Sequence, residues 1–261
     1  MLQSGAVDGI DHSRSRFLEN HPSIEELDWS PFGIPQLTHD CLPHLKSLRS
    51  NRQFITALNH PSFSSNMIGL MTPSTPLTST TPVPIEPLPA PRLSPPTTVR
   101  CIENLDIFSL NPKMLLDLKF LDRQALRRLK FHAFSDISTL HLIARTFPNI
   151  EWLSLPLIHF PSNKPHKLHP IQVSREEWLN ILPRFSKLQV FRGFGLWASV
   201  MNDRKEMHEI IKNLVQACPY LRTLDHINKH NEPDATSQIN IIREGEEGEN
   251  VRYEITKCSS R

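Results

Sequence analysis

Apolar residues recur along this chain in a short unit, in which Ile or Leu is followed three positions later by Leu or Phe. We expect the first residue of each unit to pack beneath a short strand, and the residues at +3 and +5 to point inward along that strand. Successive units start 21, 57, 24, 24, 38 and 33 residues apart. Seven units are present, at Ile24/Leu27, Leu45/Leu48, Ile102/Leu105, Leu126/Leu129, Ile150/Leu153, Leu188/Phe191 and Leu221/Leu224.

Helical patterns precede several of these units. Apolar residues share one helical face over residues 137–147 and again over 210–215. A third helix is expected at 178–182, and Ser174 with Glu177 forms a capping box at its start. This alternation predicts an α/β fold, a short irregular leucine-rich-repeat solenoid of parallel strands backed by helices. The alternative is an ordinary α/β fold in which Leu-rich sequence produces this spacing by coincidence. The occurrence of the +3 spacing seven times favours the repeat.

The pattern changes after Leu224. Residues 238–243 and 250–256 alternate between apolar and polar, and an acidic, Gly-containing segment at 244–249 separates them. This arrangement predicts a C-terminal β-hairpin that covers the open end of the repeats.

Proline is abundant, with 23 residues against only 8 glycines, and nine of the prolines lie between positions 73 and 96. Proline lacks an N–H, so this segment is expected to be a disordered insertion. Four other prolines stand two residues before a unit, where they should end a helix and start a strand; they are Pro22, Pro43, Pro148 and Pro219. The predicted division is a disordered N-terminus (1–15), first repeats (16–71), the Pro/Thr/Ser-rich insertion (72–99), main repeats (100–230), and the hairpin with a tail (231–261).

Charge and cysteine content exclude several classes of protein. A formal net charge of +2 does not favour nucleic acid as a partner. The apolar runs fall well short of the roughly 20 residues that span a bilayer, and no signal peptide precedes them. The four cysteines have no metal-ligand spacing, which favours a reduced protein of the cytoplasm, the nucleus or both. We expect a monomer without a cofactor.

Two groups of residues offer alternative chemistry. His159, His166 and His169 lie in one Pro-rich segment and would suit zinc in a metal-dependent enzyme, although their spacing matches no known site. His132, Ser135 and Asp136 supply the residue types of a hydrolase triad without a nucleophile elbow, and a helix cap explains Ser135 or Asp136 better. The sequence therefore predicts a protein that is not an enzyme.

A protein partner is expected on the sheet, at the polar positions between the apolar strand residues. Trp152 and Trp197 would add aromatic contacts, which dominate interface energetics. The predicted partner-binding residues are Glu26, Asp28, Asp106, Arg128, Lys130, Trp152, Arg192 and Asp225, with Lys46, Asn104, Ser154 and Thr223 beside them.

Several segments resemble the leucine-rich region of the fungal F-box/leucine-rich-repeat-like family, found in mushroom-forming fungi. They include FPNIEWLSLP (147–156), VSREEWLNILPRFSKLQVFRGFGLW (173–197), CPYLRTLDH (218–226) and IIREGEEGENVRYEI (241–255). The resemblance covers roughly residues 17–60 and 100–256. It implies the substrate-recognition part of a ubiquitin-ligase receptor, in which an N-terminal F-box binds the Skp1 adaptor. Residues 1–16 are too short and polar for an F-box, so Skp1 is expected as a partner only if an F-box lies upstream. Either the chain is a truncated F-box protein, or it is a repeat domain that acts alone.

Overall fold

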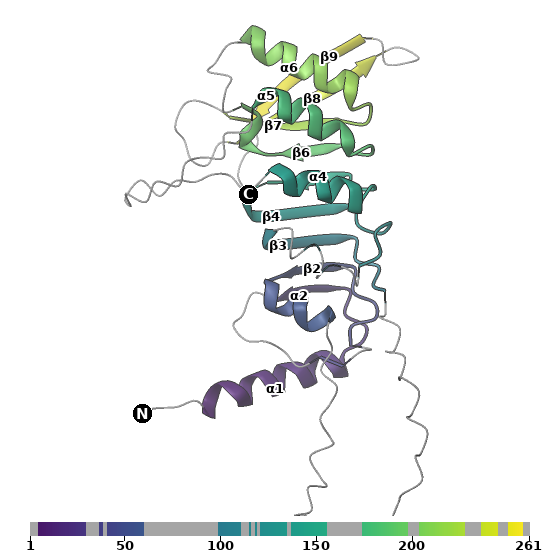
Figure 1. Cartoon of the computed structure of the whole chain (residues 1–261), viewed down its shortest axis with the longest axis vertical. Coiled ribbons are helices and arrows are strands. Elements are labelled where there is room, and N and C mark those ends of the chain that lie inside the picture. Colours follow the sequence, from purple (N-terminus) through teal and green to yellow (C-terminus); the bar gives the residue numbers. More distant parts are fainter. Residues whose placement is uncertain are drawn as a thin grey trace, which may run out of the picture.

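The computed structural model describes residues 5–29, 37–38, 41–59, 99–110, 115, 118, 121–134, 137–155, 174–197, 204–227, 236–244 and 250–257. Within these residues, nine strands form one open sheet and lie in it in chain order (Figure 1). Strands β1 to β7 run parallel, and β8 and β9 are antiparallel to their neighbours. The strands are β1 (Glu26–Trp29), β2 (Ser47–Ser50), β3 (Asn104–Leu110), β4 (Arg128–Phe134), β5 (Trp152–Ser154), β6 (Val190–Arg192), β7 (Thr223–Ile227), β8 (Thr236–Glu244) and β9 (Asn250–Lys257).

The register of the sheet aligns the seven predicted units. Each residue at +3 pairs with the equivalent residue of the next strand, in the order Leu27, Leu48, Leu105, Leu129, Leu153, Phe191 and Leu224. The backbone repeats as well, because one carbonyl before each strand accepts two successive N–H groups from the next; Glu103 O, for example, accepts from Arg127 N and Arg128 N at 2.8 and 2.9 Å. The predicted α/β class and parallel strands are therefore confirmed.

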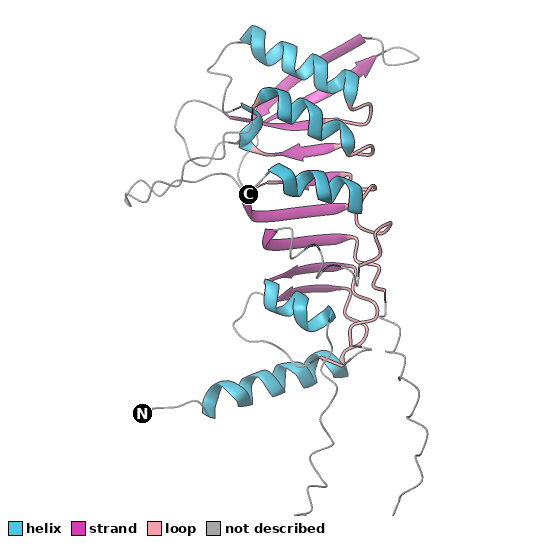
Figure 2. Cartoon of the chain, in the orientation of Figure 1, coloured by secondary structure: helices cyan, strands magenta, loops and turns pink. Residues whose placement is uncertain are grey.

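Most of the helices cover one face of the sheet, which Figure 2 shows in cyan over magenta strands, and the N-terminal helix lies at the β1 end. Their inward residues, among them Leu140, Trp178, Ile210 and Leu214, are buried together with the leucines of the strands. The predicted capping box of α5 is confirmed, since Ser174 Oγ accepts from Glu177 N at 3.2 Å and Ser174 N donates to Glu177 Oε2 at 2.8 Å. The α-helices among the described residues are α1 (Gly5–Asn20), α2 (Arg52–Asn59), α4 (Ile137–Thr146), α5 (Arg175–Ile181) and α6 (Arg204–Ala217); the 3-10 helices η2 (Leu182–Arg184) and η3 (Phe194–Trp197) accompany them.

The four prolines before the units occupy turns that lead into a strand, and Pro22, Pro148 and Pro219 also follow a helix. Pro219, for example, is the second residue of a turn closed by the hydrogen bond from Leu221 N to Cys218 O, at 3.1 Å. Proline suits this position because its fixed φ matches the turn. Since α6 ends at Ala217, proline follows the helix and leads into the strand, as the sequence predicted.

Helix α1 differs from the expectation of a disordered N-terminus over residues 1–15. Its C-terminal turn carries Leu18, which is buried with the core, and Ser15 is also buried. A single buried apolar residue, in a segment without proline, is too weak a pattern to predict this helix from the sequence. The Pro-rich insertion lies outside the described residues except at Val99.

The predicted C-terminal hairpin is confirmed, with β8 and β9 paired from Ser237 and Lys257 to Glu244 and Asn250. Ile239 and Ile241 are buried, whereas Val251 and Ile255 on β9 are 39 % and 46 % exposed. Arg243 fastens the hairpin to the end of α6, because its guanidinium donates to the carbonyls of Leu221, Cys218 and Val215 at 2.5, 2.9 and 3.3 Å.

Candidate functional site

Polar side chains form a row across the centre of the strands, on the face opposite the helices. Side chains alternate between the two faces of a strand, so the residue after each +3 apolar residue points away from the core. The register places these residues side by side, and the row, which we call the central row, consists of Asp28, Arg49, Asp106, Lys130, Ser154, Arg192 and Asp225.

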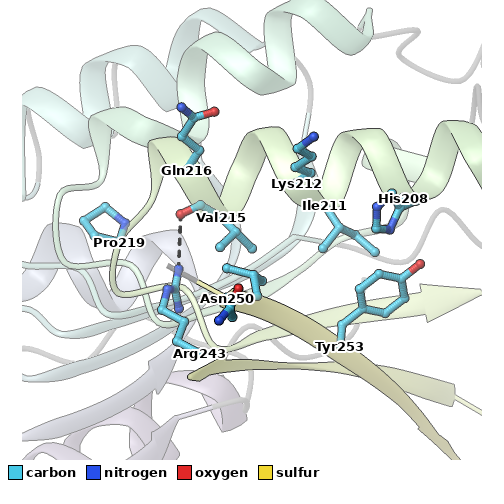
Figure 3. Close-up of a pocket in the computed structure, with 10 residues that line it drawn as sticks. His208, Ile211, Lys212, Val215, Gln216, Pro219, Arg243, Asn250 and Tyr253 are labelled. Carbon is cyan, nitrogen blue, oxygen red and sulfur yellow. Dashed lines mark hydrogen bonds between the residues drawn. The ribbon is translucent and has the colours of Figure 1, made fainter. Parts of the chain in front are cut away.

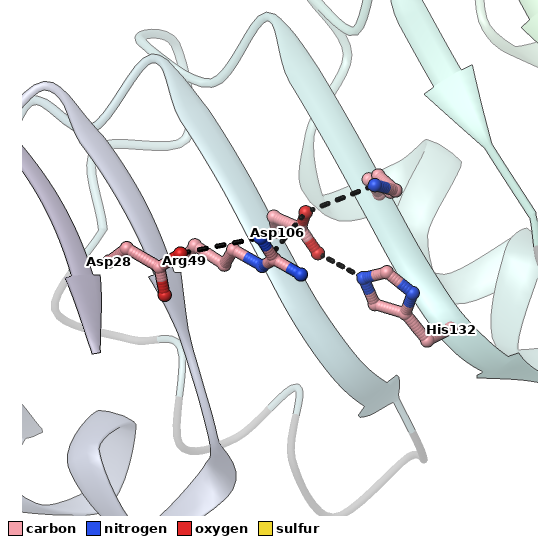
Figure 4. Close-up of polar contacts among 5 residues, drawn as sticks. Asp28, Arg49, Asp106 and His132 are labelled. Carbon is pink, nitrogen blue, oxygen red and sulfur yellow. Dashed lines mark hydrogen bonds and ion pairs between the residues drawn. The ribbon is translucent and has the colours of Figure 1, made fainter. Parts of the chain in front are cut away.

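Opposite charges pair along the central row (Figure 4). Arg49 bridges two strands, with Nη1 3.3 Å from Asp28 Oδ2 and Nε 3.7 Å from Asp106 Oδ2. Asp106 also contacts β4, where Lys130 Nζ lies 3.3 Å from its Oδ2 and His132 Nε2 lies 2.7 Å from its Oδ1. These charges are largely satisfied within the chain, and such exposed pairs contribute little to stability individually.

A second charged row runs through the residues that immediately precede strands β1, β2, β4, β5 and β6. Lys46 Nζ lies 3.0 Å from Glu25 Oε2, and Arg127 Nη1 lies 3.6 Å from Glu151 Oε1. Gln189 Nε2 continues the row by donating to Glu151 Oε2 at 3.1 Å. The hydrogen bond and charge of Glu25 raise the pKa of Lys46. Polar contacts therefore also link neighbouring strands at their N-terminal ends.

Trp152 departs from this pattern of paired charges. Its half-buried ring lies beside two guanidinium groups, with Arg128 Cζ 4.9 Å and Arg192 Cζ 5.6 Å from the ring centroid. Both distances are within the range of cation–π attraction. We call Arg128, Trp152 and Arg192 the tryptophan cluster.

One acidic residue borders the tryptophan cluster. Asp225 Oδ1 lies 3.8 Å from Arg192 Nε. Burial raises the pKa of Asp225, and the charge of Arg192 partly offsets that effect. Two guanidinium groups lie beside the ring and one carboxylate pairs with one of them, so the tryptophan cluster is locally electropositive.

The structure brings most of the predicted binding residues together. The central row contains five of them, Asp28, Asp106, Lys130, Arg192 and Asp225. The neighbouring row contains the other three. Arg128 pairs with Trp152 there, and Glu26 is the exposed first residue of that row, on β1.

Other residues were missed or misplaced. The sequence pattern indicated Lys46 in place of Arg49, although Arg49 follows Leu48 at the offset by which Asp28 follows Leu27. His132 joins the row through Asp106, whereas Ser135 and Asp136 lie outside the described residues. Ser154 is only 9 % exposed.

The expectation that Trp197 reaches the binding face is wrong. Its side chain is 7 % exposed, and its indole N–H donates to the carbonyl of Asp225. Trp197 is therefore a core residue that supports β7, and Trp152 remains as the tryptophan on the polar face.

A cavity of about 700 Å³ lies between α6 and the C-terminal hairpin (Figure 3). His208 and Lys212 border it from α6, and Arg243, Val251 and Tyr253 from the hairpin. The ring of Tyr253 lies 5.8 Å from that of His208. The sequence did not predict this cavity, which depends on how α6 packs against the hairpin.

The described residues contain no group of three or more His, Cys, Asp or Glu arranged to hold a metal ion. His159, His166 and His169 lie outside them. Cys41 and Cys218 are buried free thiols, and burial raises the pKa of each to about 11. Across the part of the chain that the structure describes, no helix combines the length and hydropathy needed to cross a membrane.

Comparisons of the chain with protein-family models, with curated protein sequences and with solved structures find no match.

Proposed function

We propose that this chain is a non-catalytic protein-binding module whose partner docks on the polar strand face. The observation that carries the proposal is the tryptophan cluster, in which two arginines flank a half-buried indole ring. In this proposal, the sheet and its helices form a short, irregular leucine-rich-repeat solenoid. Repeat proteins of this kind offer extended surfaces for binding other proteins.

The tryptophan cluster has the composition of a binding hot spot. Trp and Arg are enriched among the residues that dominate interface energies, and they act best where surrounding contacts exclude water. The paired charges of the central row would supply specificity and register around the cluster. Since cations outnumber carboxylates around Trp152, the partner is expected to present an acidic segment.

Affinity capture with charge-reversed variants tests this proposal. Proteins retained by the chain are expected to be lost with Trp152→Ala and with Arg128→Glu/Arg192→Glu. They should persist with Tyr220→Ala, which removes an exposed ring from the turn before β7. A retained protein is then purified and titrated against the same variants. If its affinity is indifferent to Trp152 and both arginines, the assignment of the polar face is wrong.

The resemblance to fungal F-box/leucine-rich-repeat-like proteins supports a narrower role, as the substrate-recognition part of a ubiquitin-ligase receptor. In that role the polar strand face would hold the protein to be ubiquitinated, and Skp1 would join only through an F-box. The alternative is a stand-alone repeat scaffold without a ligase link. A pull-down of residues 1–261 with Skp1 separates the possibilities, because direct binding would contradict the expectation that residues 1–261 lack an F-box.

A further inference from the structure

Strand β9 forms an open edge of the sheet. It pairs with β8 on one side, and among the described residues no strand pairs with its other side. Figure 1 shows β9 at the end of the sheet opposite α1. A free strand edge exposes unpaired N–H and C=O groups, which is a template for pairing with another strand.

The hydrogen-bond pattern identifies which residues of β9 carry these outward groups. Ile241 N donates to Arg222 O at 2.8 Å, so the odd-numbered residues of β8 bond toward β7 and the even-numbered ones toward β9. The register pairs even-numbered residues of β8 with even-numbered residues of β9. The outward-facing backbone groups of β9 therefore belong to Val251, Tyr253 and Ile255.

The side chains of the same three residues lie on the apolar face of the sheet. Tyr253 is directly opposite Ile241, and Ile255 is opposite Ile239, which is fully buried. Val251 and Ile255 nevertheless remain 39 % and 46 % exposed, because no further strand continues the sheet beyond them within the described residues. Another strand alongside β9 would cover both.

The sequence of β9, Asn250–Lys257, is complementary to itself when reversed about Tyr253. In an antiparallel pair centred there, Val251 lies opposite Ile255, and Arg252 opposite Glu254, twice each by symmetry. The outward groups of Val251, Tyr253 and Ile255 then bond to one another. The two adjacent registers that also match outward groups are disfavoured, because centring on residue 252 places Arg opposite Arg, and centring on residue 254 places Glu opposite Glu.

We propose that β9 is a homodimer interface, in which β9 of a second copy of this chain pairs antiparallel about Tyr253. A second copy is the expected partner, because two β9 strands match each other's charges and outward hydrogen-bonding groups in one register. A two-fold axis through Tyr253 closes the assembly, as is usual for homodimers. The sheet continues from one protomer into the other, which departs from the monomer that the sequence suggested.

Sedimentation analysis of the full chain, paired with charge reversal, tests the register. The wild type is expected to shift with concentration from a 30.0 kDa monomer to a dimer. Arg252→Glu and Glu254→Arg each place like charges opposite one another twice across the interface, and each should weaken dimerisation at least about tenfold. Because Arg252 Nε also lies 3.0 Å from Glu244 Oε1 of its own chain, Glu254→Arg is the variant that leaves this internal ion pair intact. Lys187→Glu, in an exposed turn before β6, makes the same change in net charge as Arg252→Glu and should leave dimerisation unchanged.

Mixing the two variants gives the decisive result. Arg252→Glu and Glu254→Arg chains attract each other in the proposed register, so their mixture should form heterodimers although each chain alone is weakened. Hydrogen exchange should show that the amides of Val251, Tyr253 and Ile255 gain protection with concentration. The proposal would be overturned if the wild type stays monomeric. It would also be overturned if the dimer forms equally well with either charge-reversed variant alone and with their mixture.

Discussion

Gly193 shows how closely the chain packs where it leaves β6. A Cβ atom at this position would lie 2.9 Å from Phe191 Cζ and 3.4 Å from Leu155 Cβ. Both neighbours are buried, so neither has room to move away. Glycine is therefore required here for the close approach of the chain to β6.

Gly193→Ala is expected to lower the free energy of unfolding by about 1–3 kcal/mol, as overpacking in a core does. Urea denaturation measures the loss. The background variant Phe191→Leu removes the atom that the new methyl group meets, so adding Gly193→Ala to it should cost clearly less. Equal costs in both backgrounds would show that the strain arises elsewhere.

The two buried thiols make stability depend on alkaline pH. Burial raises the pKa of Cys41 and Cys218 from 9.0 to about 11, because the folded state favours the neutral thiol. The associated stabilisation is complete below pH 9 and is lost as the pH rises through 11. The double variant Cys41→Ala/Cys218→Ala should show a shallower loss of stability between pH 9 and 11 than the wild type in denaturant titrations. If the stability of the double variant and of the wild type fell equally between pH 9 and 11, the two thiols would not be the cause.

At the level of single elements, α5 depends on its N-terminal cap. Ser174 and Glu177 satisfy each other's backbone N–H groups, and Ser174→Ala removes half of this exchange. The expected loss is about 1 kcal/mol of unfolding free energy, measured by thermal or urea denaturation. Ser174→Asp keeps an acceptor at the cap and should retain most of the stability. A loss with Asp as large as with Ala would rule out the cap as the cause.

Elements with a strong local pattern were predictable, and those without one were not. The +3 spacing located strands β1 to β7 because the units after the first bury the same two positions, as Leu126 and Leu129 illustrate, and the first packs Ile24 and Leu27 against the core. Helix α1 was missed because its described packing rests on few residues, chiefly Leu18 and Ser15. The hairpin was foreseen from its alternation, but the exposure of Val251 and Ile255 was not, since exposure depends on what lies beyond the edge.

The sequence predicted which side of the sheet carries the candidate site, but it predicted few of the contacts between the side chains there. Alternation along the strands is enough to place Asp106, Lys130 and Arg192 on the polar side. Which charges meet depends on the register between strands far apart in sequence, which explains why Arg49 and the contact of His132 with Asp106 were missed. Trp197 was misjudged because it lies on η3, behind β7.

Across the whole molecule, the two faces of the sheet differ in chemistry. The apolar face and its helices provide stability, while the polar face carries two rows of alternating charge interrupted by the tryptophan cluster. Because most charges in the rows are already paired, the proposed function assigns the docking of the partner chiefly to the tryptophan cluster. The two proposed contacts, a protein on the polar face and a second copy at β9, use different surfaces and can form together.

Photo-crosslinking in cells tests the binding face most directly. A photoreactive phenylalanine analogue at position 152 should yield a discrete covalent adduct with a partner protein, and the adduct should diminish with Arg128→Glu/Arg192→Glu. The same analogue in place of Leu142, which is exposed on helix α4, is expected to give no such adduct. Adducts from position 142 together with none from position 152 would contradict the central claim that the polar strand face binds the partner.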